Sequence, residues 1–260
     1  MKSVSAFLGS VALATALVLA VWFGFLAAFP QIGPRIGQTP MDVWAYLFDG
    51  EPAHRARIVD GLTITLRDAG LGFAVGMSLA LSGAALALLS REFERSAVPV
   101  ATLLRSIPLV TLAPILVATF GRGLTMVAVT GALVVFFPAF VTIVAGLRAA
   151  PAQSMDLIRA YGGSEAAALC MVALPAALPS LFAALRISVP GALIGALIAE
   201  WLGTGVGLGS SMLKAIPRYD YPQLWASIAV VAAASIMLYT VVGAVERVVT
   251  LRFADPSVIS

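Results

Sequence analysis

The chain has 260 residues, of which 60% are hydrophobic and only 11% are charged, and its mean hydropathy is +1.00. A soluble domain of this length needs more charged residues to cover its surface. The composition therefore places the chain in a lipid bilayer. The net charge of +3 comes from scattered residues without a basic run, which argues against nucleic-acid binding. A single histidine, His54, and a single cysteine, Cys170, leave little from which to build a metal site, a Ser-His-Asp triad or an internal disulfide.

The first apolar run covers residues 8–29. We interpret it as a retained membrane span, because it is longer than the apolar core of a signal peptide and no clear cleavage site follows. The next connection, residues 30–60, contains Thr39-Pro40-Met41-Asp42, the pattern of a helix N-cap followed by proline and an acid in the first turn. Aromatic residues follow at once, so we expect a short helix at the membrane surface.

Five further apolar runs, each near the 20 residues that cross a bilayer, bring the expected number of spans to about six. They cover about residues 66–89, 98–120, 124–146, 181–202 and 224–245. Arg105 and Arg186 are expected near the ends of spans, with their charges reaching the interface. The small-residue patterns Gly72-x-x-x-Gly76 and Gly191-x-x-x-Gly195 predict close helix packing within the chain rather than a dedicated dimer motif.

Six spans place both termini on one side of the membrane, together with the segment between spans four and five. Basic residues outside the spans divide almost evenly between the two sides. The charge distribution therefore does not orient the chain.

The segment from 147 to 179 interrupts the hydrophobic rhythm. Asp156 and Arg159 are three residues apart and share a helix face, whereas Gly162-Gly163 permits a sharp bend and Ser164 can cap a second helix. The pattern predicts a compact helix–turn–helix that projects from the bilayer as a docking surface, with a plain connector as the alternative. Its ten central residues are Asp156, Leu157, Ile158, Arg159, Ala160, Tyr161, Gly162, Gly163, Ser164 and Glu165.

This segment resembles the cytoplasmic loop of ABC-importer permeases, written E-A-A, three residues, Gly, nine residues, Ile-x-Leu-Pro. Gly162, Val172 and Leu174-Pro175 fall at the family spacing, and Asp156 takes the acidic position, but Leu157 and Ile158 replace the two alanines. Flanking stretches are similar to the nitrate/sulfonate/taurine/pyrimidine branch of the family over roughly residues 60–250. They include Leu104-Arg105-Ser106-Ile107-Pro108, Phe136-Phe137-Pro138 and Ala199-Glu200-Trp201-Leu202-Gly203.

The resemblance implies an all-α fold like that of type I ABC importers, with about six transmembrane helices and a cytoplasmic coupling helix between spans four and five. Residues 1–60 would form the first span and an external loop with an interfacial helix. Residues 61–250 would form the permease core with its coupling loop at 151–175, and residues 251–260 a tail. Both termini would be cytoplasmic in a bacterial inner membrane.

The same resemblance implies partners. No phosphate-binding P-loop occurs in the sequence, so ATP and Mg²⁺ are expected on a separate ATPase subunit, present in two copies, and no cofactor on this chain. A second permease copy, as a homodimer or heterodimer, and an extracytoplasmic binding protein would complete the importer. Ser106, Thr111 and Glu200 are candidates for the translocation path or gate. Glu200 has the alternatives of an arginine partner or a place among lipid headgroups.

Two other classes of membrane protein fit the sequence less well. An ion-coupled secondary carrier would need no ATPase, but the chain shows no obvious inverted repeat and no acids in the middles of the expected spans. A membrane-embedded enzyme lacks a cluster of catalytic side chains. The solute is not readable from the sequence.

Overall fold

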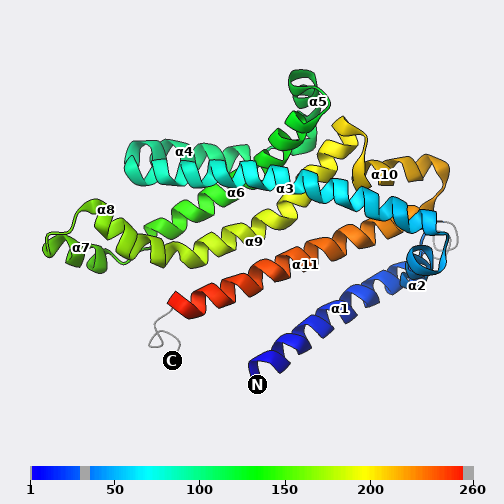
Figure 1. Ribbon diagram of the computed structural model, residues 1–260, viewed down its shortest axis with the longest axis horizontal. Helices are drawn as coiled ribbons and strands as arrows, with labels where there is room; N and C mark the ends of the chain where they lie inside the picture. Colours follow the sequence, from blue (N-terminus) through cyan, green and yellow to red (C-terminus); the bar gives the residue numbers. More distant parts are fainter. Residues whose placement is uncertain (1, 30–35, 254–260) are drawn as a thin grey trace. The chain divides into compact units, whose positions relative to one another are not determined.

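The computed structural model describes residues 2–29 and 36–253, and this part of the chain is built from helices with no strands (Figure 1). The all-α class is therefore confirmed. The α-helices are α1 (Lys2–Ala28), α2 (Pro40–Trp44), α3 (Pro52–Leu89), α4 (Arg91–Leu104), α5 (Leu109–Phe120), α6 (Leu124–Arg148), α7 (Ala152–Ala160), α8 (Glu165–Ala168), α9 (Leu174–Ala199), α10 (Gly207–Ala215) and α11 (Tyr221–Phe253). Short π-helical turns occur at η1 (Ala45–Asp49), η2 (Leu169–Ala173) and η3 (Glu200–Thr204), and a 3-10 turn at η4 (Ile216–Arg218).

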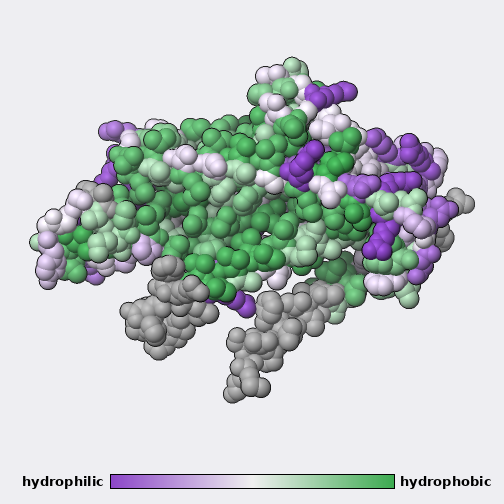
Figure 2. All heavy atoms as spheres, viewed as in Figure 1, coloured by the Kyte–Doolittle hydropathy of each residue, from purple (hydrophilic) through white to green (hydrophobic). Residues whose placement is uncertain are grey.

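Within the described residues, four helical stretches are long and apolar enough to cross a membrane. The bent pair of α4 and α5 makes a fifth if it counts as one span, and α1 carries a shorter apolar stretch at Ala16–Ala28. Over the long helices the exposed surface is largely hydrophobic (Figure 2), as lipid contact requires. The four long stretches are Pro52–Leu89, Leu124–Arg148, Leu169–Thr204 and Tyr221–Thr250.

The third expected span, 98–120, is not one straight helix. α4 ends at Leu104 and α5 starts at Leu109 at an angle of 101°. Pro108 lies at the N-cap of α5 with extended backbone angles, and proline lacks the amide that a continuing helix would need. The polar residues Arg105 and Ser106 and the proline Pro108 lie at the break, but one charge in an otherwise apolar run does not by itself predict a bend.

The chain divides into two compact units. One contains residues 60–210 and 231–260, and its core forms where α6 packs along α9 and α3. A Cβ on Gly131 of α6 would lie 2.6 Å from the Cα of Gly72, and one on Gly195 would lie 2.8 Å from the Cα of Gly131. The glycines singled out in the sequence therefore serve packing inside the chain, as predicted.

The other unit contains residues 1–59 and 211–230. Trp22 stacks on Trp225 with ring centroids 5.2 Å apart, and the two indole N–H groups donate to the carbonyls of Gln38 and Ile36. The short helix α2 begins with the predicted cap, because Thr39 Oγ1 accepts from the amide of Asp42 while the Asp42 carboxylate accepts from the Thr39 amide. These contacts fix the connection after α1.

Candidate coupling loop and translocation path

The predicted helix–turn–helix is present between α6 and α9. α7 ends at Ala160, Gly162 adopts a left-handed conformation with φ of +80°, and Ser164 Oγ accepts from the amide of Ala167. Arg159 and Asp156 form an ion pair of 2.7 Å on one face of α7. The second helix is continuous with the next long helix, because α8 runs directly into η2, and η2, α9 and η3 together form the helical stretch Leu169–Thr204.

This hairpin lies at one end of α6 and α9 (Figure 1). α7 buries none of its residues, Tyr161 is 86% exposed and Leu157 is 56% exposed. Large apolar groups in that position are typical of a protein–protein contact rather than of a connector.

The break between α4 and α5 borders a cavity of about 670 Å³ lined also by residues of α6 and α9. Ser106 Oγ donates to the Thr102 carbonyl at 3.3 Å, at the end of α4. Thr111 Oγ1 donates to the Pro108 carbonyl at 2.7 Å, which also accepts from the Thr111 amide. The remaining lining is mostly apolar. Irregular backbone beside a cavity is how membrane proteins tolerate a broken span.

Arg105 lies at the break and lines the same cavity. α4 has 14 residues, which corresponds to about 20 Å of helix rise. Arg105 is therefore the length of α4 away from the charged turn at Arg91 and forms the C-cap of α4. The residue is exposed, and the expectation that its charge reaches the interface stays a prediction.

Glu200 is completely buried in the π-helical turn that follows α9. Its Oε2 accepts a hydrogen bond of 2.6 Å from the amide of Gly209, whereas Oε1 has no partner in the described part of the chain. Gly207 has φ of +91°, and a Cβ there would overlap the Glu200 carboxyl group. Burial excludes a place among headgroups, and the observed partner is the first turn of α10 rather than an arginine.

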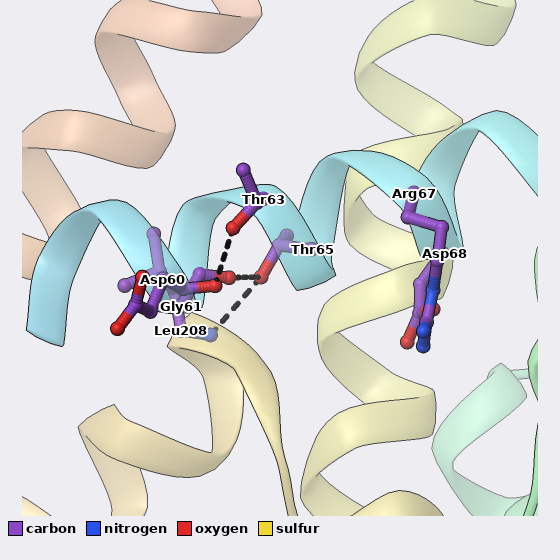
Figure 3. A network of polar contacts seen from close by, with 7 residues as sticks. All are labelled: Asp60, Gly61, Thr63, Thr65, Arg67, Asp68 and Leu208. Carbon is purple, nitrogen blue, oxygen red and sulfur yellow. Dashed lines mark hydrogen bonds and ion pairs between the residues drawn. The ribbon is translucent and has the colours of Figure 1, made fainter.

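A threonine of α3 completes this arrangement (Figure 3). Thr65 is fully buried, accepts a 3.0 Å hydrogen bond from the amide of Leu208 and donates to the carbonyl of Gly61. One helical turn further along α3, the buried carboxylate of Asp68 accepts from Arg67. Thr65 therefore ties the start of α10 to α3, as Glu200 ties it to η3.

A further ion pair joins α9 and α11. Arg186 lies 2.7 Å from the Glu246 carboxylate, and its guanidinium also lies over the ring of Tyr239 at 5.5 Å. Both charges are within helical stretches that can cross a membrane. The structure thus gives Arg186 an acidic partner that the sequence did not predict, whereas its place near a span end stays a prediction. Asp68 and Glu246 lie at or beyond the ends of the expected spans 66–89 and 224–245, not in their middles.

Comparison with known proteins identifies the family. Residues 72–255 match the family described as binding-protein-dependent transport system inner membrane component, which is more than two thirds of the chain. The chain belongs to this family. It is an ABC importer permease of the branch expected from the sequence, not a secondary carrier.

Two relatives and one solved structure illustrate the match. A protein of Haemophilus influenzae named as a probable ABC transporter permease is 31% identical over 86% of this chain and 89% of its own length. The formylaminopyrimidine transport permease ThiX of Halalkalibacterium halodurans is 31% identical over 72% of this chain and 75% of its own. An inward-facing structure of the MetNI methionine ABC transporter shares the fold, with a TM-score of 0.68 at 19% identity over 77% of this chain and all of that one.

The permease geometry contains functional candidates that the sequence did not reveal. Thr65, Arg186 and Glu246 meet partners that lie far away in the sequence, so no local pattern marked these contacts. The glycine-rich stretch after Glu200 was the one available signal, since glycine spacing of this kind allows a side chain to approach the backbone closely.

Proposed function

We propose that this permease moves a small solute, delivered by an extracytoplasmic binding protein, across the bacterial inner membrane. Two copies of the chain would pair with two ATPase subunits, which bind ATP and Mg²⁺, while this chain binds no cofactor. Both termini and the 156–165 hairpin would face the cytoplasm. The membership of the binding-protein-dependent family carries this proposal.

The hairpin is the surface that contacts the ATPase subunit, and through it ATP hydrolysis drives the movement of the membrane spans. Its support is the exposed α7 surface around Leu157 and Tyr161 and the direct continuation of the hairpin into α9. A displacement of α8 would reach α9 through consecutive helical residues, and rigid elements transmit such displacements well. Asp156, Arg159 and the bend at Gly162 would hold the surface in shape.

Residues at the α4–α5 break form part of the translocation path or its gate. Arg105 and Ser106 line the cavity there, and Thr111 lies in the first turn of α5 beside it. The buried Glu200 anchors α10 beyond the end of α9. Broken helices beside a cavity are common at the solute sites of transporters. ThiX is named for formylaminopyrimidine transport, and the solute of the present permease would be found by identifying the ligand of its binding protein.

The coupling role is tested with Gly162→Trp in proteoliposomes that contain the permease, its ATPase and its binding protein. We expect transport to be lost while the spans stay folded, because a bulky side chain would stand on the docking surface and strain a left-handed position. Gly121→Trp is the matched control, since Gly121 also has a positive φ and open surroundings but lies between α5 and α6. Normal transport by Gly162→Trp would refute the coupling assignment.

Co-purification in detergent provides an independent check. An ATPase subunit should accompany the wild-type chain and should be depleted by Tyr161→Ala, which removes an 86% exposed side chain without disturbing the core. If the same amount of ATPase accompanies the variant, Tyr161 is not part of the contact.

A further inference from the structure

A second cleft of about 670 Å³ lies between α4 and α6, near the end where α6 leads into α7. Arginines Arg91, Arg95 and Arg148 line one part of it, and apolar side chains including Val98 and Val141 line the rest. The cleft is distinct in composition from the largely apolar cavity at the α4–α5 break. It combines cationic groups with an apolar wall.

One of the three arginines is already neutralised. Arg148 forms a two-pronged ion pair with Glu94, in which Nε lies 2.9 Å from Oε1, and its guanidinium also donates to the Ala87 carbonyl. This contact fixes Arg148 against the ends of α3 and α4. Glu94 is thereby occupied and cannot compensate further positive charge in the cleft.

The other two arginines have no ion pair within the described part of the chain. Arg91 and Arg95 are four residues apart on α4, so they lie on the same face and their charges repel each other. Glu92 is exposed in the first turn and is not among the lining residues. The cleft therefore presents two uncompensated guanidinium groups, a good match for an oxyanion.

The surroundings favour a lipid over a free anion. Arg91 begins α4 directly after α3 ends, and the neighbouring Leu89 is 81% exposed, as expected for a side chain that faces lipid. From the arginines, the lining continues along α4 to Val98 and Pro99 and across to Val141 of α6. A phosphate at the arginines would leave an acyl chain free to follow this wall, whereas a free phosphate would gain nothing from it.

We propose that the cleft between α4 and α6 binds an anionic phospholipid, with its phosphate between Arg91 and Arg95 and an acyl chain against Val98, Pro99 and Val141. The site lies at the junction of the broken third span with the helix that leads into the hairpin. A bound lipid would hold α4 and α6 together at this end. Binding is independent of the identity of the transported solute.

The test is native mass spectrometry of the full-length chain in detergent, titrated with phosphatidylglycerol, phosphatidylcholine or inorganic phosphate. We expect phosphatidylglycerol to be retained preferentially, and Arg91→Gln/Arg95→Gln to weaken its retention by about 30-fold, the combined effect of two surface charges. Arg122→Gln/Arg218→Gln removes two exposed arginines elsewhere and should retain the lipid as the wild type does. Arg91→Lys/Arg95→Lys should keep most of the binding, which separates lost charge from misfolding.

Equal retention of phosphatidylglycerol and phosphatidylcholine would overturn the proposal, as would an equal loss in the two glutamine double variants. Competition by inorganic phosphate as effective as that by the lipid would show a site for free anions and would also overturn it. Failure of the Gly162 experiment would leave this result unaffected, because the two tests measure different surfaces.

Discussion

The amide of Gly209 donates a 2.6 Å hydrogen bond to the buried carboxylate of Glu200. This bond joins the first turn of α10 to the π-helical turn at the end of α9, and the Leu208 amide makes the parallel connection to Thr65 of α3. Short helices have little stability of their own, so α10 depends on such anchors for its position.

Glu200→Ala should destabilise the permease by roughly 2–4 kcal/mol, because it leaves the Gly209 amide without an acceptor and opens a cavity. Glu200→Gln keeps an acceptor oxygen and should cost about 1 kcal/mol. Thermal unfolding in detergent measures both, with the exposed Glu51→Ala as control. An unfolding midpoint of Glu200→Ala equal to that of wild type would contradict the anchoring role.

Gly72→Leu should separate α3 from α6, because even a Cβ at this position would lie 2.6 Å from the Cα of Gly131. We expect a loss of about 3 kcal/mol or more and a poor yield of folded protein. Gly70→Leu lies on the same helix with no atom within 4 Å of the added Cβ, so it should be nearly neutral. Size-exclusion profiles and unfolding midpoints compare the two, and equal effects would argue against the packing role.

Neutralising either partner of the Arg186–Glu246 pair should cost about 1–3 kcal/mol, since the remaining charge stays in a helix that crosses the membrane. The double variant Arg186→Gln/Glu246→Gln should be more stable than the sum of the single losses predicts. A double-mutant cycle on unfolding measures this coupling. The exposed Asp156–Arg159 pair serves as comparison and should couple by less than about 0.5 kcal/mol; equal coupling in the two cycles would count against a structural role for the membrane pair.

Burial raises the pKa of Tyr46 above its ordinary value of 10.0, and the nearby negative charge of Asp220 adds to the effect. The positive charge of Arg57 opposes the shift without cancelling it. Because the pKa of Tyr46 is raised in the folded state, its contribution to stability is fully present below pH 10. This contribution is lost as the pH rises through the pKa of the folded protein. Unfolding midpoints should therefore fall with alkaline pH in this range, and Tyr46→Phe should remove that component of the fall. An identical alkaline profile for the variant would show that Tyr46 does not contribute.

Several features followed from local sequence because local interactions produce them. The cap at Thr39, the left-handed Gly162 and the Asp156–Arg159 pair each involve residues within four positions of one another. Most long helices were also predicted, since an apolar run of sufficient length in a bilayer has to satisfy its own backbone hydrogen bonds. The bend at Pro108 was missed, because hydropathy does not report direction.

Membrane residence, the all-helical class, the hairpin before the fifth span and the resemblance to ABC-importer permeases could be read from the sequence. The partners of the buried polar side chains could not, because they depend on how the helices pack. Glu200 accepts a hydrogen bond from Gly209, only nine residues away. Thr65 contacts Leu208, and Arg186 contacts Glu246, across much longer separations in the sequence. A buried polar group takes whichever partner the packing of helices brings within hydrogen-bond distance, and that packing depends on every helix at once.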